Sequence, residues 1–166
     1  MRKLLLGGVL GIVVLGLIAC GDSSGNSASG EAIERQADYW VISQLQKNFH
    51  EATSKKDIDL MMSLYAPNAT LTIPGRTAVG TEQIRQFWLT KSEAFRPDNK
   101  WISETPAYKM EITANGDKGT LHFECHYVDV EGKTVAVYLT ADQEVARIDG
   151  RWFITDMVIG SASLRP

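Results

Sequence analysis

Residues 120–159 read TLHFECHYVDV-EG-KTVAVYLTADQEVARI-DG-RWFITDMVI, which is the pattern of three β-strands joined by two tight turns. Apolar and polar residues alternate along much of these runs, as in strands that place successive side chains on opposite faces. The pairs Glu131-Gly132 and Asp149-Gly150 have the chemistry of hairpin turns, and Asp and Gly both tolerate the positive φ of a type I′ turn. The stretch therefore predicts consecutive antiparallel hairpins.

One more strand is predicted over residues 101–113, with Asn115-Gly116 as the turn that follows it. Before Pro97 the apolar residues recur every three or four positions, which indicates helices. Helices followed by an antiparallel meander define an α+β domain. One curved sheet wrapped around the first helix is the economical arrangement.

The first of these helices is predicted over residues 31–52. Its apolar stripe would consist of Ile33, Ala37, Trp40, Val41, Leu45, Phe49 and Ala52. A short second helix, with Ile58 and Tyr65 near its two ends, stops before Pro67, and residues 70–73 form a short β-rich run. A third helix is expected to be capped by Thr81. Its buried face would comprise Ile84, Phe87 and Trp88.

Two-residue turns also predict the pairing of the strands. Counting outward from Glu131-Gly132 places Cys125 opposite Tyr138, and counting from Asp149-Gly150 places Asp142 opposite Met157. The face toward the helices would then hold Leu121, Phe123, Cys125, Tyr127, Tyr138, Thr140, Asp142, Thr155, Met157 and Ile159. The other face would hold His122, Glu124, His126, Val135, Val137, Leu139, Val145, Trp152, Ile154 and Val158.

Both predicted faces are substantially apolar, which a sheet covered on one side only would not show. Helices are therefore expected on one face, and a second, identical subunit on part of the other. A β-bulge in the strand at residues 133–148 would swap the faces beyond it, because it inserts one unpaired residue.

The first twenty residues have the layout of a secretory signal: Arg2 and Lys3, an apolar run over residues 4–17, and a small residue before Cys20. The run is shorter than the about 20 apolar residues of a spanning helix. Leu-Ile-Ala-Cys at residues 17–20 resembles the lipobox of bacterial lipoproteins. The resemblance implies cleavage before Cys20 and acylation of Cys20 with chains such as palmitate; an uncleaved anchor helix is the alternative.

This reading divides the chain into a signal peptide at residues 1–19, a lipidated Cys and flexible tether at 20–30, and a folded domain at 31–166. The tether prediction rests on the Gly- and Ser-rich run GDSSGNSASG. The domain would work outside the cytoplasm, anchored by lipid to the bacterial cell membrane. The sequence does not distinguish between envelope types.

Composition narrows the possible partners. Without Arg2 and Lys3 the formal net charge falls from −3 to about −5, which argues against nucleic acid or an anionic lipid surface as partner. After lipidation of Cys20, Cys125 is the only cysteine, so no internal disulfide can form and packing must supply the stability.

Three motifs in order are YAPNATL at 65–71, GTEQIRQFW at 80–88 and DGRWFI at 149–154. Together they resemble the SnoaL-like branch of the nuclear-transport-factor-2-like superfamily over about residues 31–159. The resemblance implies a cone-shaped half-barrel of three N-terminal helices on a curved, mainly antiparallel sheet. It also implies a pocket between helices and sheet, and frequent dimerisation through the outer sheet face.

Members of this superfamily include steroid isomerases, polyketide cyclases, dehydratases and domains without chemistry, so the fold does not decide the function. Steroid isomerases need a carboxylate base, a Tyr and a protonated Asp. The resemblance places these groups at Ile73, Phe49 and Asp142 of this chain, so only Asp142 matches. Steroid isomerase activity is therefore not expected.

Structural roles are expected for most of the other residues that could carry chemistry. His122 and His126 would lie about 13 Å apart on a strand, too far for one metal ion, so no metal site and no cofactor are predicted. Cys125 is expected to be a buried, inert thiol, because no Lys or His beside it on that face would lower its pKa. Trp40 and Trp88 are most simply core residues, and His50 is expected at the surface or at a pocket rim.

The preferred prediction is a lipid-anchored extracytoplasmic domain that binds a small, largely apolar molecule without transforming it. Its expected pocket lining is Phe49, Ile73, Trp88, Tyr138, Asp142 and Met157. One alternative is an isomerase, cyclase or dehydratase that uses Asp142, with His50 as a second candidate, for acid–base catalysis. Another is a protein-interaction module of the cell envelope. The binding and the catalytic predictions both assume that Asp142 and Met157 face the same interior, whereas the interaction module does not.

Overall fold

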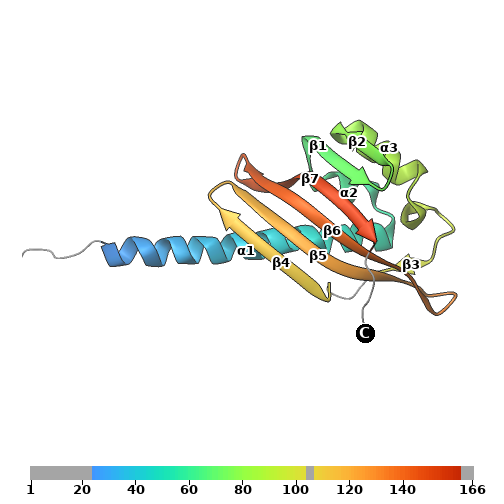
Figure 1. Cartoon of the computed structure of the whole chain (residues 1–166), viewed down its shortest axis with the longest axis horizontal. Helices are drawn as coiled ribbons and strands as arrows, with labels where there is room; N and C mark the ends of the chain where they lie inside the picture. The colour runs from blue at the N-terminus through green and yellow to red at the C-terminus, as the bar shows by residue number, and fades with distance from the viewer. Residues whose placement is uncertain (1–23, 104–106, 162–166) are drawn as a thin grey trace, which may run out of the picture.

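The computed structural model describes residues 24–103 and 107–161, in which one long helix crosses a curved sheet and two shorter helices cover one end of it (Figure 1). The helices are α1 (Ser24–Lys55), α2 (Ile58–Met62) and α3 (Gly80–Thr90), followed by a short 3₁₀ helix, η1 (Glu93–Phe95). The predicted α+β class, with three N-terminal helices packed on a curved sheet, is confirmed. No helix in the described part of the chain is long and apolar enough to cross a bilayer.

The sheet contains seven strands in the spatial order β2-β1-β7-β6-β5-β3, and β4 also pairs with β5. β1 and β7 run parallel, whereas the other described pairs are antiparallel. The strands are β1 (Tyr65–Ile73), β2 (Arg76–Val79), β3 (Trp101–Ile102), β4 (Lys109–Asn115), β5 (Lys118–Asp129), β6 (Thr134–Ile148) and β7 (Arg151–Ser161). The strand predicted over 101–113 is thus two strands, and Tyr65 opens β1 rather than closing α2.

Helix α1 begins at Ser24, earlier than the predicted start at Glu31. Part of the expected tether, residues 24–30, is therefore helical, because extending an existing helix costs far less than starting one. The rest of the tether, the signal peptide and Cys20 lie outside the described residues. The predicted Thr81 cap is also wrong: α3 begins at Gly80, after Val79, and no side chain caps it.

Only the second half of the predicted apolar stripe of α1 packs in the core. Leu45, Phe49 and Ala52 are buried, but Ile33 is 71% exposed, Trp40 66% and Val41 39%. The core-facing side of the first half is formed by Asp38 and Ile42 instead. The expectation that Trp40 is a core residue is therefore wrong. The N-terminal end of α1 projects beyond the sheet (Figure 1), and Trp40 lies on the side of the helix opposite the buried Asp38 and Ile42.

Two β-bulges overturn the predicted pairing of the long strands. Tyr127 pairs with Val137 and Val128 with Val135, so Ala136 is an extra residue on β6. Beyond it Cys125 pairs with Leu139 rather than with Tyr138. A second bulge inserts Thr155 into β7, because Glu144 pairs with Asp156 and Val145 with Ile154.

These one-residue shifts exchange the faces of β6, because neighbouring residues of a strand point to opposite sides. Asp142 pairs with Val158, and the neighbouring Gln143 pairs with Met157 and is buried. The prediction that Tyr138, Thr140 and Asp142 face inward is therefore wrong. The inner positions on β6 belong to Val137, Leu139, Ala141, Gln143 and Val145. The burial of Trp152 and Ile154 likewise corrects their predicted outward orientation.

The turns explain which part of the register could be predicted. Asp149 and Gly150 have φ values of 50° and 78°, as a type I′ turn requires, and Ile148 pairs with Arg151 as predicted. The turn at Glu131-Gly132 is wider, because Asp129 pairs with Thr134 and accepts bonds from the amides of Glu131 and Gly132. Pairing next to both turns agrees with the prediction, and the errors begin at the bulges.

Gly119 is expected to be intolerant of any side chain. A Cβ at this position would overlap the carbonyl oxygen of Thr113 and lie 3.2 Å from Val145 Cγ2. We expect Gly119→Ala to lower the free energy of unfolding by about 2 kcal/mol, because the hairpin of β4 and β5 must open to admit the methyl group. Urea unfolding followed by circular dichroism measures the change. Gly30→Ala is the control, because nothing lies within 4 Å of a Cβ at that position. Equal losses of unfolding free energy in the two variants would contradict the prediction.

Candidate functional site

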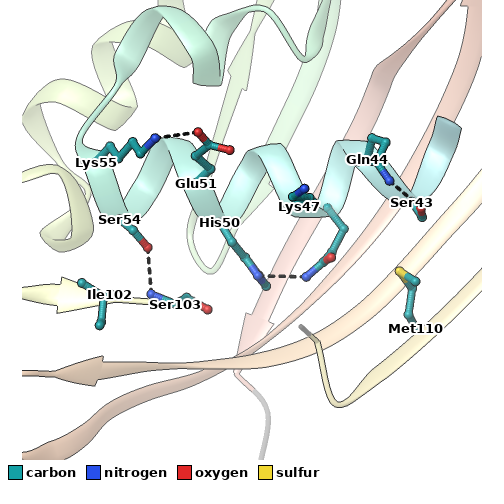
Figure 2. Close-up of a pocket in the computed structure, with 11 residues that line it drawn as sticks. Ser43, Gln44, Lys47, His50, Glu51, Ser54, Lys55, Ile102, Ser103 and Met110 are labelled. Atoms are coloured by element: carbon teal, nitrogen blue, oxygen red, sulfur yellow. Dashed lines mark hydrogen bonds and ion pairs between the residues drawn. The ribbon is translucent and has the colours of Figure 1, made fainter. Parts of the chain in front are cut away.

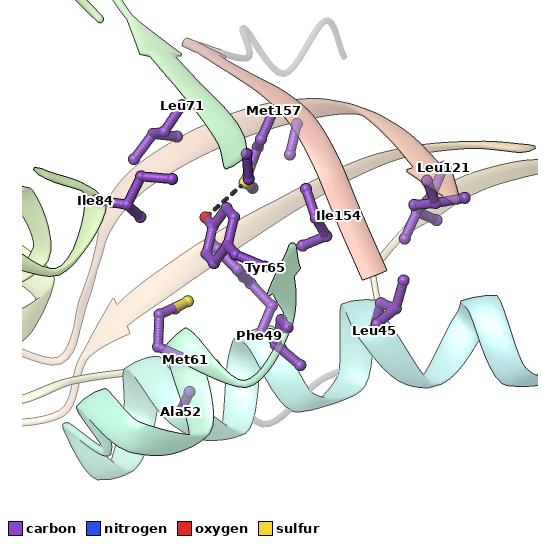
Figure 3. Close-up of a cluster of buried hydrophobic side chains, with 14 of the residues drawn as sticks. Leu45, Phe49, Ala52, Met61, Tyr65, Leu71, Ile84, Leu121, Ile154 and Met157 are labelled. Atoms are coloured by element: carbon purple, nitrogen blue, oxygen red, sulfur yellow. Dashed lines mark hydrogen bonds between the residues drawn. The ribbon is translucent and has the colours of Figure 1, made fainter. Parts of the chain in front are cut away.

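A cluster of buried apolar side chains occupies the interior between the helices and the sheet (Figure 3). The ring of Phe49 lies 5.7 Å from the rings of both Trp88 and Phe123, in edge-to-face and tilted contacts. The hydroxyl of Tyr65 donates to Met157 Sδ over 3.1 Å, and burial raises the pKa of this hydroxyl well above its usual value. Phe49, Trp88 and Met157 are therefore buried core residues, and none of them lines the recess described below.

The other three expected lining residues lie apart from this interior. Ile73 closes β1 and is half-buried. Tyr138 is on the outer sheet face, with its ring 6.0 Å from that of His126. The side chain of Asp142 is 64% exposed on the same face, and its Oδ1 lies 2.7 Å from Nδ1 of His122. The six predicted residues are thus not brought together.

A recess with a volume of about 490 Å³ lies between α1 and the edge strands β3 and β4 (Figure 2). Nine of its eleven lining residues carry polar groups, although most of the exposed lining surface is apolar. The lining residues are Ser43, Gln44, Gln46, Lys47, His50, Glu51, Ser54, Lys55, Ile102, Ser103 and Met110. We call this feature the α1–β4 recess.

Three buried polar residues form the floor of the α1–β4 recess: Gln46, His50 and Ser103. Gln46 Nε2 lies 2.8 Å from Nδ1 of His50, one helical turn further along α1. The edge of the His50 imidazole meets Phe123 at a centroid distance of 5.4 Å, which helps to fix the ring plane. With the Gln46 amide as donor, Nδ1 of His50 accepts and the ring proton lies on Nε2.

Hydrogen bonds to Ser103 hold β3 against α1 at one end of the recess. The backbone amide of Ser103 donates to Ser54 Oγ over 2.8 Å, and its hydroxyl donates to the carbonyl of His126 over 3.1 Å. At the end of α1, Lys56 Nζ contacts the carbonyl of Trp101 at 3.2 Å, and partial burial lowers the pKa of this amine. The wall opposite α1 is thus anchored by polar contacts.

The rim of the recess carries more positive than negative charge. Glu51 pairs with Lys55 over 2.7 Å, and this contact lowers the pKa of the Glu51 carboxyl and raises that of the Lys55 amine. Lys47 is exposed at the same rim. Apolar surface comes from Ile102 and Met110 on the sheet side. The recess therefore offers a hydrogen-bonding floor, a small apolar wall and a basic rim.

His50 is the one candidate catalytic residue of the sequence that lines this recess. It is buried rather than at the surface, which corrects the expectation of a surface or rim histidine. An imidazole at the floor of a recess can move a proton to or from a bound molecule. In residues 24–103 and 107–161 no three His, Cys, Asp or Glu side chains are arranged to hold a metal ion.

Apart from His50, sequence reasoning did not single out the polar residues of α1 that face the recess. Ser43, Lys47, His50 and Ser54 recur at three- and four-residue intervals, beside the apolar stripe, so a helical signal was present. Ser103 and Met110 carry no such signal, because they approach α1 only through the pairing of β3 and β4 with β5. Cys125 is buried, and burial raises the pKa of its thiol to about 12, so it is poorly suited to nucleophilic chemistry.

Comparison with known proteins connects this architecture to a family. Residues 34–158 match the family model described as the SnoaL-like domain. No curated protein matches the chain significantly. The chain is similar in structure to a nuclear-transport-factor-2-like protein with a cystatin-like fold from Novosphingobium aromaticivorans, with a TM-score of 0.69 and 14% identity. The similarity covers 87% of this chain and 92% of that one.

Two further solved structures resemble the chain at similar levels. One is the hexachlorocyclohexane dehydrochlorinase LinA-type3 of Novosphingobium barchaimii, with a TM-score of 0.65, 18% identity, and coverage of 81% of this chain and 93% of that one. The other is a protein of unknown function with a cystatin-like fold from Nostoc punctiforme, with a TM-score of 0.65, 21% identity, and coverage of 78% and 95%. At these identities the likeness establishes the fold alone.

Proposed function

The chain belongs to the SnoaL-like domain family, and from this premise we propose that it is a lipid-anchored extracytoplasmic domain that binds a small amphipathic molecule in the α1–β4 recess. The observation that carries the proposal is the buried pair of His50 and Gln46 at the floor of an open recess of about 490 Å³. That volume is within the range of small-molecule sites, which is roughly 300–1,000 Å³.

The lining favours a ligand with a polar, preferably negative, head and a short apolar body. The rim carries two ammonium groups, those of Lys47 and Lys55, and one carboxylate, that of Glu51. An anionic group near the rim would meet favourable charge, and a hydrogen-bonding group could reach the floor. Ile102 and Met110 offer contact to an apolar body. Compared with the largely apolar molecule that the sequence alone suggested, this ligand carries in addition a polar head for the rim and the floor.

The anchor proposal rests on the sequence of the first twenty residues. The basic start, the apolar run and Cys20 after Leu-Ile-Ala are the features on which lipoprotein processing depends. Two or more acyl chains on Cys20 would give stable attachment without a polybasic patch.

A catalytic role remains the second proposal, and His50 supports it better than Asp142 does. Asp142 lies on the outer sheet face beside His122, away from the α1–β4 recess, and cannot serve a ligand held there. Two of the similar structures are named hexachlorocyclohexane dehydrochlorinases, so the fold can host elimination chemistry in other chains. Here His50 would act as the acid or base.

A ligand screen on the full-length chain tests the binding proposal. We expect octanoate and benzoate to raise the melting temperature, and Lys47→Glu to weaken their binding about tenfold, because it reverses one charge at the rim. Lys91→Glu is the matched control: it makes the same charge change at an exposed position at the end of α3. Equal affinities of the two variants, or no stabilisation by either carboxylate, would contradict the proposal.

The same binding assay separates binding from catalysis. His50→Gln retains hydrogen-bonding groups but cannot move a proton near neutral pH. A substrate that His50→Gln binds normally but no longer converts would support the enzymatic proposal. Binding by both forms without conversion in either would support a binding domain.

A further inference from the structure

A row of apolar side chains lies exposed on the outer side of α1. It consists of Ile33, Ala37, Trp40 and Val41, which we call the α1 outer stripe. Their spacing of four, seven and eight residues places them on one side of the helix. An exposed Trp beside Ile and Val is uncommon on a surface that faces only water, so this stripe points to a contact.

The acidic side chains of the same helix segment lie on the sheet side of α1, away from the α1 outer stripe. Asp38 is buried against the sheet, and its Oδ2 accepts a bond from Arg147 Nη2 over 2.6 Å. Glu34, one helical turn earlier, lies 3.7 Å from the same guanidinium. The acidic groups of this part of α1 are therefore held by Arg147 on the sheet side. The outer stripe itself contains no charged residue.

The chain that precedes α1 indicates what covers the stripe. Cys20 is separated from the first residue of the helix, Ser24, by only three residues. Three extended residues span roughly 10 Å, so acyl chains on Cys20 would hold the start of α1 close to the lipid headgroups. A helix that stood upright there would raise Trp40 about 24 Å from Ser24, whereas a helix that lay flat would bring the stripe to the surface.

We propose that α1 lies along the membrane, with the α1 outer stripe inserted at the boundary between headgroups and acyl chains. This inference rests on the lipid anchor proposed above. Trp favours that boundary because its ring is apolar and its N–H is polar. The insertion depends on apolar contact, so it does not need the basic helix face of a charge-driven binder. Lys47, seven residues after Trp40, lies on the same side, so the rim of the α1–β4 recess would be near the headgroups.

Tryptophan fluorescence of the full-length acylated chain in phosphatidylcholine vesicles tests the proposal. Brominated phosphatidylcholine quenches tryptophans that reach the acyl boundary, and we expect about threefold more quenching in the wild type than in Trp40→Phe. Trp101→Phe is the matched control, because Trp101 is half-buried at the other end of the domain. Quenching should persist at high salt, since apolar contacts are not screened.

The remaining outcomes separate this proposal from the anchor. Co-sedimentation with vesicles, with Trp40 unquenched by brominated lipid and quenched by aqueous iodide, would overturn the flat orientation and leave the anchor intact. Protection of Trp40 from both quenchers would show that a protein surface, such as a second copy, covers the stripe, and would also overturn the proposal. Failure of the chain to co-sediment would overturn the anchor and this proposal together.

Discussion

Phe49→Ala is expected to lower the free energy of unfolding by about 4 kcal/mol, a large part of the total for a domain of this size. Phe49 is 1% exposed, and its ring lies at the centre of the aromatic cluster with Trp88 and Phe123. Truncation removes these ring contacts and leaves a cavity between α1 and the sheet, which neighbouring aromatic rings cannot fill without leaving their own positions. Urea unfolding followed by circular dichroism measures the loss.

Two further variants show that the loss arises from packing. Phe49→Leu should cost clearly less than Phe49→Ala, because leucine retains most of the apolar volume. Trp40→Ala removes a larger aromatic ring from the same helix, but Trp40 is exposed, so in the absence of membrane the free energy of unfolding should change by no more than about 0.5 kcal/mol. A loss for Phe49→Ala that did not exceed that for Trp40→Ala would contradict the packing that Figure 3 shows.

Asp38→Ala is expected to lower the free energy of unfolding by about 3 kcal/mol. The carboxylate accepts bonds from Arg147 Nη2 over 2.6 Å and from Trp152 Nε1 over 3.1 Å, and the guanidinium also lies over the Trp152 ring at 5.1 Å. Without Asp38, the buried N–H of Trp152 loses its acceptor, and the Arg147 guanidinium keeps only the exposed carboxylates of Glu34 and Asp117. Removal of one partner from a buried pair typically costs about 3–5 kcal/mol, and the partial exposure of Arg147 places this case at the lower end.

Glu34→Ala provides the control, because Glu34 approaches the same guanidinium at 3.7 Å and its side chain is 69% exposed. Its removal should change stability by no more than about 0.5 kcal/mol. Asp38→Asn should fall between the two, since the amide oxygen can still accept one bond. Thermal unfolding of the three variants gives the order of their stabilities directly. If Glu34→Ala lowered the free energy of unfolding as much as Asp38→Ala does, the buried network would be refuted.

The distance along the chain explains why this network could not be predicted. Asp38 and Arg147 are 109 residues apart, and the sequence offers no rule that pairs a helical carboxylate with a particular arginine on a distant strand. A carboxylate in the middle of an amphipathic helix ordinarily lies on the solvent side. The structure buries Asp38 because β6 and β7 bring Arg147 and Trp152 to the same point of α1.

The same reasoning applies to the candidate site. His50 and its polar neighbours on α1 have a regular spacing, so one wall of the α1–β4 recess was implicit in the sequence. The other wall depends on where β3 and β4 join β5, which is a long-range property. Asp142 shows the opposite case: its expected place in the interior depended on register, and a one-residue shift moved it to the outer face beside His122.

Local patterns in the sequence therefore determined the α+β class, the order of the three helices and of the three long C-terminal strands, and the type I′ turn at Asp149-Gly150, but they gave no sign of β2 and merged β3 with β4. Those features depend on side-chain periodicity and on backbone preferences within a few residues. Only the tertiary structure decided which side of β6 faces the helices, that the interior is filled, and that a recess forms beside α1. The physical reason is that the extra residues Ala136 and Thr155 have no local signature, yet each bulge reverses the facing of the strand beyond it.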